Sequence, residues 1–197
     1  VRIFNKGISA DEVTKLYNEI QCANTINTPE SYFNTKLYTG TGNSGLQVTG
    51  LSFQPDFTWI KVRNSSSWNH LLIDSVRGFA SDGDAKIVSS NSTEVEFERA
   101  SISSFNSNGF TLGDYGGSNE SSSYNYVSWN WKAASSNTTN NDGTIASTVR
   151  ASQESGFSIV SYTATGTLAT VGHGLASKPQ LILAKVRNQA YNWIAYA

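Results

Sequence analysis

The stretch that decides the fold is Tyr124-Asn125-Tyr126-Val127-Ser128-Trp129-Asn130-Trp131-Lys132. Successive side chains of a β-strand point to opposite faces of the sheet, so apolar residues at every second position mark a buried face. Val127, Trp129 and Trp131 follow this rule, although Asn125 on the same face does not. The pattern predicts a strand over 124–132 whose Val127, Trp129 and Trp131 face packs against the core.

Other short runs of β-branched and aromatic residues lie on both sides of this strand, between turn signals rich in Gly, Asn and Ser. Many short strands at such spacing are typical of a sandwich or barrel. We therefore expect an all-β fold, a jelly-roll-like β-sandwich. The further strands expected are Phe33–Thr39, Leu46–Thr49, Phe57–Arg63, Leu71–Ser75, Lys86–Val88, Val95–Arg99, Ser103–Phe105, Gly109–Leu112 and Gly156–Thr163.

Composition agrees with a folded β protein and excludes several classes of function. A disordered chain would combine few aromatics with high charge, whereas this one has 12% aromatic and only 15% charged residues. The net charge of −1, with no basic block, argues against a nucleic-acid partner. No apolar run is long enough to span a bilayer. The single cysteine cannot close an intramolecular disulfide.

The N-terminal residues differ from the rest. Ser9-Ala10-Asp11-Glu12 fits a capping box, and apolar residues at helical spacing follow it, which predicts one short helix. Residues 21–31 and 134–150 are polar and read as linkers. Both ends fall inside strand-like runs, so we expect a window from a longer polypeptide.

An internal repeat organises the remainder. Gly50-Leu51, Pro55 and Lys61-Val62-Arg63-Asn64 recur as Gly174-Leu175, Pro179 and Lys185-Val186-Arg187-Asn188, each 124 residues later. The chain is therefore expected to hold one complete β module over 32–133 and, over 151–197, the first half of a second.

Residues 1–20 contain Val1-Arg2-Ile3-Phe4-Asn5-Lys6-Gly7-Ile8-Ser9-Ala10-Asp11-Glu12-Val13. This stretch resembles the C-terminal end of laminin-G-like, concanavalin A-type jelly-roll domains of phage and bacterial surface proteins. The resemblance implies that Val1–Phe4 is the last strand of such a domain.

Five blocks carry a second resemblance: Tyr38–Gly42, Gly50–Lys61, Asp74–Gly78, Phe105–Gly113 and Tyr126–Lys132. In this order they resemble a domain of unknown function that recurs, as tandem β modules, in tail and fibre proteins of marine phages. The resemblance implies a virion structural or host-contact role. It supplies no catalytic residues.

Candidate ligand-contacting residues come from two places. Trp68 is followed by His70 and Asp74, which share a face at strand spacing, so the indole could stack on a sugar ring while the other two hydrogen-bond its hydroxyls. Tyr115 and Tyr124 flank a loop rich in Gly, Ser and Asn, and tyrosines in such loops are frequent contact residues. Ordinary packing and turn formation explain the same residues.

Two groups of acidic residues have simpler explanations than a metal site or a catalytic site. Asp82-Gly83-Asp84 offers oxygen ligands for Ca²⁺ but lacks the further ligands of an EF-hand or repeat array. Glu94, Glu96 and Glu98 alternate along a predicted strand, where three like charges indicate a solvated face. Glycoside hydrolysis needs two convergent carboxylates. We therefore expect no catalytic residues, no metal and no cofactor.

The function expected is structural and adhesive: part of a bacteriophage tail fibre or surface appendage, exposed on the virion, that contacts the host. Its expected partners are other copies of itself, trimeric by resemblance, other virion proteins and a host-surface glycan. Two alternatives remain, a carbohydrate-binding module of a secreted bacterial protein and a depolymerase.

Overall fold

The computed structural model describes residues 9–11 and 28–197. The predicted N-terminal strand lies outside these residues, and so does the predicted helix apart from residues 9–11. A short 3-10 helix, η1 (Pro29–Ser31), precedes the first strand. No helix in the described part of the chain is long and apolar enough to cross a membrane.

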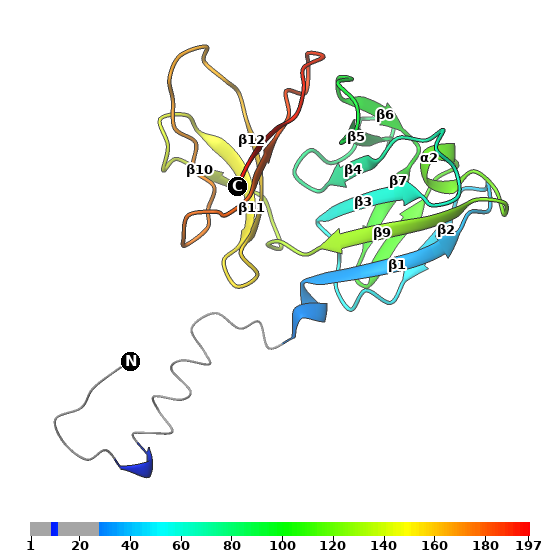
Figure 1. The fold of residues 1–197 in the computed structure, drawn as a ribbon, viewed down its shortest axis with the longest axis horizontal. Coiled ribbons are helices and arrows are strands. Elements are labelled where there is room, and N and C mark those ends of the chain that lie inside the picture. Colours follow the sequence, from blue (N-terminus) through cyan, green and yellow to red (C-terminus); the bar gives the residue numbers. More distant parts are fainter. Residues whose placement is uncertain (1–8, 12–27) are drawn as a thin grey trace.

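The fold is all-β, as the sequence predicts. A six-stranded antiparallel sheet has the order β1-β9-β3-β4-β5-β6, and a three-stranded sheet with the order β2-β8-β7 packs on one of its faces (Figure 1). The bounds are β1 (Phe33–Thr39), β2 (Leu46–Thr49), β3 (Phe57–Val62), β4 (Leu71–Asp74), β5 (Ala85–Ser89), β6 (Phe97–Arg99), β7 (Ile102–Asn106), β8 (Gly109–Leu112) and β9 (Asn125–Trp131). One helical turn, α2 (Gly116–Asn119), lies between β8 and β9. Each strand predicted in this region is present, and its observed ends differ from the predicted ones by at most two residues.

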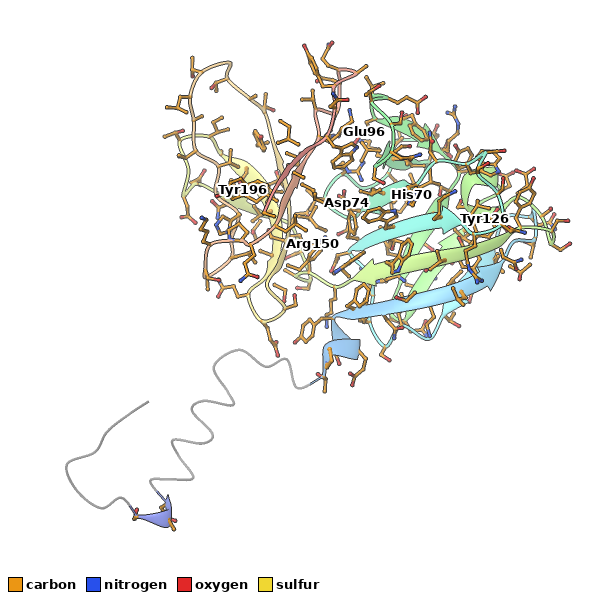
Figure 2. All side chains as sticks on the ribbon, in the orientation of Figure 1. His70, Asp74, Glu96, Tyr126, Arg150 and Tyr196 are labelled. Carbon is orange, nitrogen blue, oxygen red and sulfur yellow. The ribbon has the colours of Figure 1, made fainter. Side chains whose placement is uncertain are left out.

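The prediction of which face of β9 meets the main core was wrong. Tyr126, labelled in Figure 2, is fully buried among the core residues, and Ser128 and Asn130 on the same face are also inaccessible. Their polar groups are paired: Asn130 accepts from the Thr58 hydroxyl and donates to Ser128. A polar face can be buried when its hydrogen bonds are satisfied, so alternation in polarity did not identify it.

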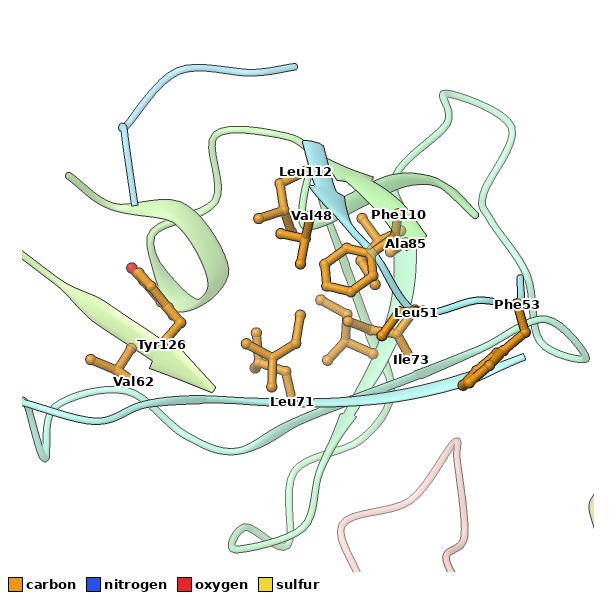
Figure 3. Packing of buried hydrophobic residues seen from close by; sticks show 13 residues of the cluster. Val48, Leu51, Phe53, Val62, Leu71, Ile73, Ala85, Phe110, Leu112 and Tyr126 are labelled. Carbon is orange, nitrogen blue, oxygen red and sulfur yellow. The ribbon is translucent and has the colours of Figure 1, made fainter. Parts of the chain in front are cut away.

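The core lies between the two sheets. Thirteen buried side chains form it, and Figure 3 shows how those of the six-stranded sheet meet those of β2 and β8. Leu51 follows Gly50, whose φ of +84° suits glycine, and this turn directs Leu51 into the interior. The members are Val48, Leu51, Phe53, Ile60, Val62, Leu71, Ile73, Ala85, Ile87, Ile102, Phe110, Leu112 and Tyr126.

The chain continues into further β structure that the sequence reading partly missed. Strands β10 (Thr138–Asn140), β11 (Ser147–Ser152) and β12 (Phe157–Tyr162) form a second three-stranded sheet, and β13 (Ile182–Ala184) and β14 (Ile194–Tyr196) form a hairpin. Of these, β12 was expected as a strand, and β14 lies in the C-terminal run that was described as strand-like. The stretch 134–150, predicted to be a linker from its polar composition, holds β10 and the start of β11.

Local geometry recurs at the two halves of the sequence repeat. Gly174 has a φ of +71°, close to that of Gly50. Strand β12 begins at Phe157, at the same offset from Phe33 of β1 as in the sequence repeat. The ammonium of Lys61 donates to the carbonyl of Trp68, and that of Lys185 donates to the carbonyl of Tyr191. Residues 28–133 are called the first copy below, and residues 138–197 the second copy.

The second copy packs against the outer face of the six-stranded sheet. The Phe157 ring stacks on Trp131 at 6.0 Å and lies 5.9 Å from Phe57. The Arg150 guanidinium reaches Asp56 at 2.6 Å, and the Trp193 indole donates to the Ser89 carbonyl. These contacts explain why the Trp131 side of β9 is also partly buried.

A candidate binding cleft

A cleft of about 550 Å³ opens where β6, the loop before β4 and the loop before α2 meet the C-terminal segment. Volumes of a few hundred Å³ are typical of small-ligand sites. Figure 1 shows the C-terminal segment, in red, beside the β5–β6 edge of the large sheet. The lining residues are Ser67, Trp68, Asn69, Glu94, Val95, Phe97, Arg99, Tyr115 and Ala190.

Two aromatic rings form one wall of the cleft. Trp68 and Tyr115 meet edge to face, with ring centroids 5.6 Å apart, an arrangement that aromatic quadrupoles favour. Gly116 permits this approach, because a Cβ at that position would lie 2.6 Å from the Trp68 ring. The two rings therefore pack against each other, and both line the cleft.

Two residues of opposite charge, Arg99 and Glu94, also line the cleft. Burial raises the pKa of the Tyr115 phenol, while Arg99 opposes that rise and Glu94 adds to it, so both charges lie close to the ring. The Arg99 guanidinium sits 5.7 Å from the Phe97 ring and donates to the Glu98 carbonyl. Among the described residues neither Glu94 nor Arg99 forms an ion pair. Their remaining donor and acceptor sites can bind a ligand.

The sequence-predicted site residues are separated by the fold. Trp68 and Tyr115 come together in the cleft. Asp74 does not line it: this carboxylate is buried, pairs with the Arg77 guanidinium and accepts from two backbone N–H groups. Tyr124 packs against the hydrophobic core, as Trp68 and Tyr115 also do, but unlike them it does not line the cleft. Asp74 and Tyr124 thus have structural contacts.

The Asp82-Gly83-Asp84 segment forms a turn. The Asp82 carboxylate accepts from the Asp84 backbone N–H at 3.1 Å, and Gly83 has a φ of +91°. Across residues 9–11 and 28–197, no group of three or more His, Cys, Asp or Glu side chains is placed to hold a metal ion. The turn accounts for the residue types at these positions.

The expectation of a solvated glutamate face was wrong for Glu96. This side chain is only 15% exposed and pairs with both Arg77 and Arg187. Glu94 lies in the cleft, and Glu98 is opposite Lys86 in the β5–β6 register. Strand β6 begins at Phe97, so the three residues do not continue one regular strand. Sequence reasoning missed Glu94, Arg99 and Ala190 as cleft residues, because no motif marks them.

His70 lies on the outer face of the sheet, away from the cleft. Its Nδ1 accepts a hydrogen bond of 2.9 Å from the Trp59 indole, and its backbone N–H donates to Asn91. The pKa of His70 is lowered, chiefly by burial and secondly by the charge of Lys61. Protonation would place a donor on Nδ1 opposite the indole N–H, so the neutral imidazole fits this position.

We expect this arrangement to make stability depend on pH. Because the folded chain disfavours the imidazolium, the unfolded chain takes up the proton more readily, and stability falls as the pH drops below the ordinary pKa of 6.5. Urea unfolding midpoints between pH 7.5 and 5.2 should decrease for the wild type and change less for His70→Gln. Equal pH dependence of the two proteins would contradict the role given to His70.

Comparison with known proteins finds one match. A family model described as "Domain of unknown function (DUF7483)" matches residues 28–197. No curated protein and no solved structure is detectably similar to the chain.

Proposed function

The chain belongs to the DUF7483 family over residues 28–197, and we propose that it is a non-catalytic adhesive module that contacts a surface glycan through the Trp68–Tyr115 cleft. The observation that carries the proposal is the composition of that cleft, which is lined by two aromatic rings in contact, a carboxylate, a guanidinium and an amide. A pyranose ring has an apolar C–H face and a rim of hydroxyls. Aromatic rings suit the first, and Glu94, Asn69 and Arg99 suit the second.

The same cleft supports binding without hydrolysis. Glycosidases place two carboxyl groups on opposite sides of the scissile bond. Of the described residues that line this cleft, Glu94 alone carries a carboxylate. The cleft, as the described residues line it, therefore offers one carboxyl group and no second one to act as nucleophile or general base.

The proposed setting is a bacteriophage tail fibre or comparable surface appendage, exposed on the virion and in contact with the host. Support comes from the repeat, in which the Lys61 and Lys185 contacts recur, and from the resemblance to tail and fibre domains. Assembly with further copies and other virion proteins would multiply weak glycan contacts by raising the effective concentration.

A second candidate is a carbohydrate-binding module of a secreted bacterial protein, which the same cleft favours. Cryo-electron microscopy of the particle or filament that carries the chain distinguishes the two. Repeated copies in a fibre or on a capsid support the virion setting. Recovery of the chain as a free secreted protein supports the second candidate.

Binding through the cleft is tested with the complete 197-residue chain. The probes are cellohexaose, xylohexaose, mannohexaose, chitohexaose and an array of bacterial lipopolysaccharides and capsular polysaccharides. We expect Trp68→Ala and Tyr115→Ala each to weaken binding of the probe that binds the wild type by about tenfold. Each substitution removes one of the two rings of the aromatic wall, and the loss of about 1.4 kcal/mol of binding free energy corresponds to a factor of ten. Isothermal titration calorimetry measures the change.

Tyr162→Ala is the matched control, since Tyr162 is an exposed tyrosine on β12 that does not line the cleft. Its affinity should equal that of the wild type. Circular dichroism verifies that each variant is folded. Unchanged affinity in both cleft variants would place the glycan elsewhere and reject the proposed site.

A further inference from the structure

One wall of the cleft is held by the second copy. Glu94 and Val95 line the cleft and precede β6, outside the hydrogen-bonded ladder of the large sheet. Local turn bonds hold Ser92 and Glu94. The longer-range hydrogen bonds of its backbone that the structure describes come from the second copy: the Glu96 N–H donates to the Arg187 carbonyl at 2.7 Å, and the Thr93 carbonyl accepts from Lys185 at 3.2 Å.

An ion-pair cluster, formed by Glu96 with Arg187 and Arg77 and called the clasp below, holds the same segment. The Arg187 guanidinium donates two hydrogen bonds to the Glu96 carboxylate, from Nε to Oε2 at 2.9 Å and from Nη2 to Oε1 at 2.7 Å. Arg77, whose side chain is 8% exposed, donates to Glu96 from the other side and is itself paired with Asp74. Figure 2 places Glu96 and Asp74 on the side of the large sheet that faces the second copy. Two-point contacts of this kind add directional restraint to charge attraction.

The second copy also lines the cleft directly. Ala190 follows Arg187 by three residues and lines the cleft. Lys185 donates to the Tyr191 carbonyl, and the Tyr191 N–H donates to the Gln189 carbonyl, so the loop that carries Ala190 has a defined shape. Arg187 therefore connects two parts of the cleft that lie more than ninety residues apart in sequence.

We propose that the glycan cleft is a composite site assembled from two consecutive copies, with Arg187 as a positioning residue that never touches the ligand. This inference rests on the proposed glycan function for its ligand but not for its geometry. In a tandem array with these contacts, the number of sites equals the number of joints between copies rather than the number of copies.

Hydrogen exchange of the full chain without ligand tests the geometry. In Arg187→Ala the amide of Glu96 and those of residues 188–191 should exchange at least about tenfold faster, because the clasp restrains both segments. Arg63→Ala is the matched control: Arg63 is the sequence-repeat counterpart of Arg187 and is exposed. Its exchange pattern should equal that of the wild type. Unchanged exchange in Arg187→Ala overturns the proposal.

The effect on glycan binding is tested by isothermal titration calorimetry. The ligand is the array glycan that binds the wild type or, if no array glycan binds, the tightest-binding hexasaccharide. Affinity should fall by about tenfold in Arg187→Ala and stay constant in Arg63→Ala. Faster exchange with unchanged affinity would show that the clasped walls do not contribute to binding, which also overturns the proposal. Failure of the wild-type chain to bind any probe would reject the glycan function instead, and the exchange result would still decide whether the second copy holds the wall.

Discussion

Replacing Asn119 by alanine is expected to lower the free energy of unfolding by about 3–4 kcal/mol, because buried groups that lose a hydrogen-bond partner each cost about 1–3 kcal/mol. Asn119 is fully buried at the end of α2. Its side-chain oxygen accepts from the backbone N–H groups of Thr41 and Gly42, and its amide donates to the carbonyls of Asn43 and Gly113. One side chain thus joins two loops to the helical turn.

Urea unfolding followed by tryptophan fluorescence measures the loss. Asn43→Ala provides the control, since Asn43 is exposed and its side chain makes one local bond to Thr41; it should change stability by no more than about 0.5 kcal/mol. A loss below about 1 kcal/mol for Asn119→Ala would show that water replaces these bonds.

The second large effect is expected at Asp56, where alanine should cost about 3–5 kcal/mol, because removal of one partner leaves a largely buried charge uncompensated. Asp56 Oδ1 accepts from Arg150 at 2.6 Å and from the Ser75 hydroxyl, and Oδ2 accepts from the Ala133 N–H. The Arg150 and Asp56 side chains are 12% and 5% exposed. The substitution therefore removes an ion pair between the two copies as well as two hydrogen bonds within the first copy.

Urea unfolding of Asp56→Ala and Asp142→Ala gives the comparison. Asp142 is exposed and accepts a bond from its neighbour Asn140, so its replacement should change stability little. Hydrogen exchange of β11 should also accelerate in Asp56→Ala. Equal unfolding curves for the two variants would contradict a structural role for the Asp56 contacts.

The strands of the first copy could be predicted because their sequences combine residues that favour strands with turn residues at each end. Phe57–Val62 and Leu71–Asp74 combine β-branched and aromatic residues with turn residues at each end, and the structure places strands at both. Strands β10 and β11 were missed because their polar composition resembles that of a linker. Thr138–Asn140 is polar throughout, although its threonines favour strands, and pairing with β11 places it in a sheet.

The candidate site was predictable only in part. Trp68 and Tyr115 drew attention as large amphipathic residues in polar loops, and the fold brings them together. Asp74 shared their polarity but lies next to Arg77, whose partnership needs the turn after β4. Nothing at Glu94 or Arg99 distinguishes a cleft residue from an ordinary surface charge, because distance to the aromatic wall is a property of the fold.

The sequence by itself determined that this protein is all-β and that Lys61-Val62-Arg63-Asn64 recurs as Lys185-Val186-Arg187-Asn188, since alternation and repetition are local properties of the chain. Only the tertiary structure decided which face of β9 is the core and which of the two repeated arginines forms a clasp. Those outcomes depend on what packs opposite each residue: Phe157 covers Trp131, and Arg187 pairs with Glu96, whereas Arg63 forms no ion pair among the described residues. Burial and pairing come from neighbours distant in sequence, so no local pattern records them.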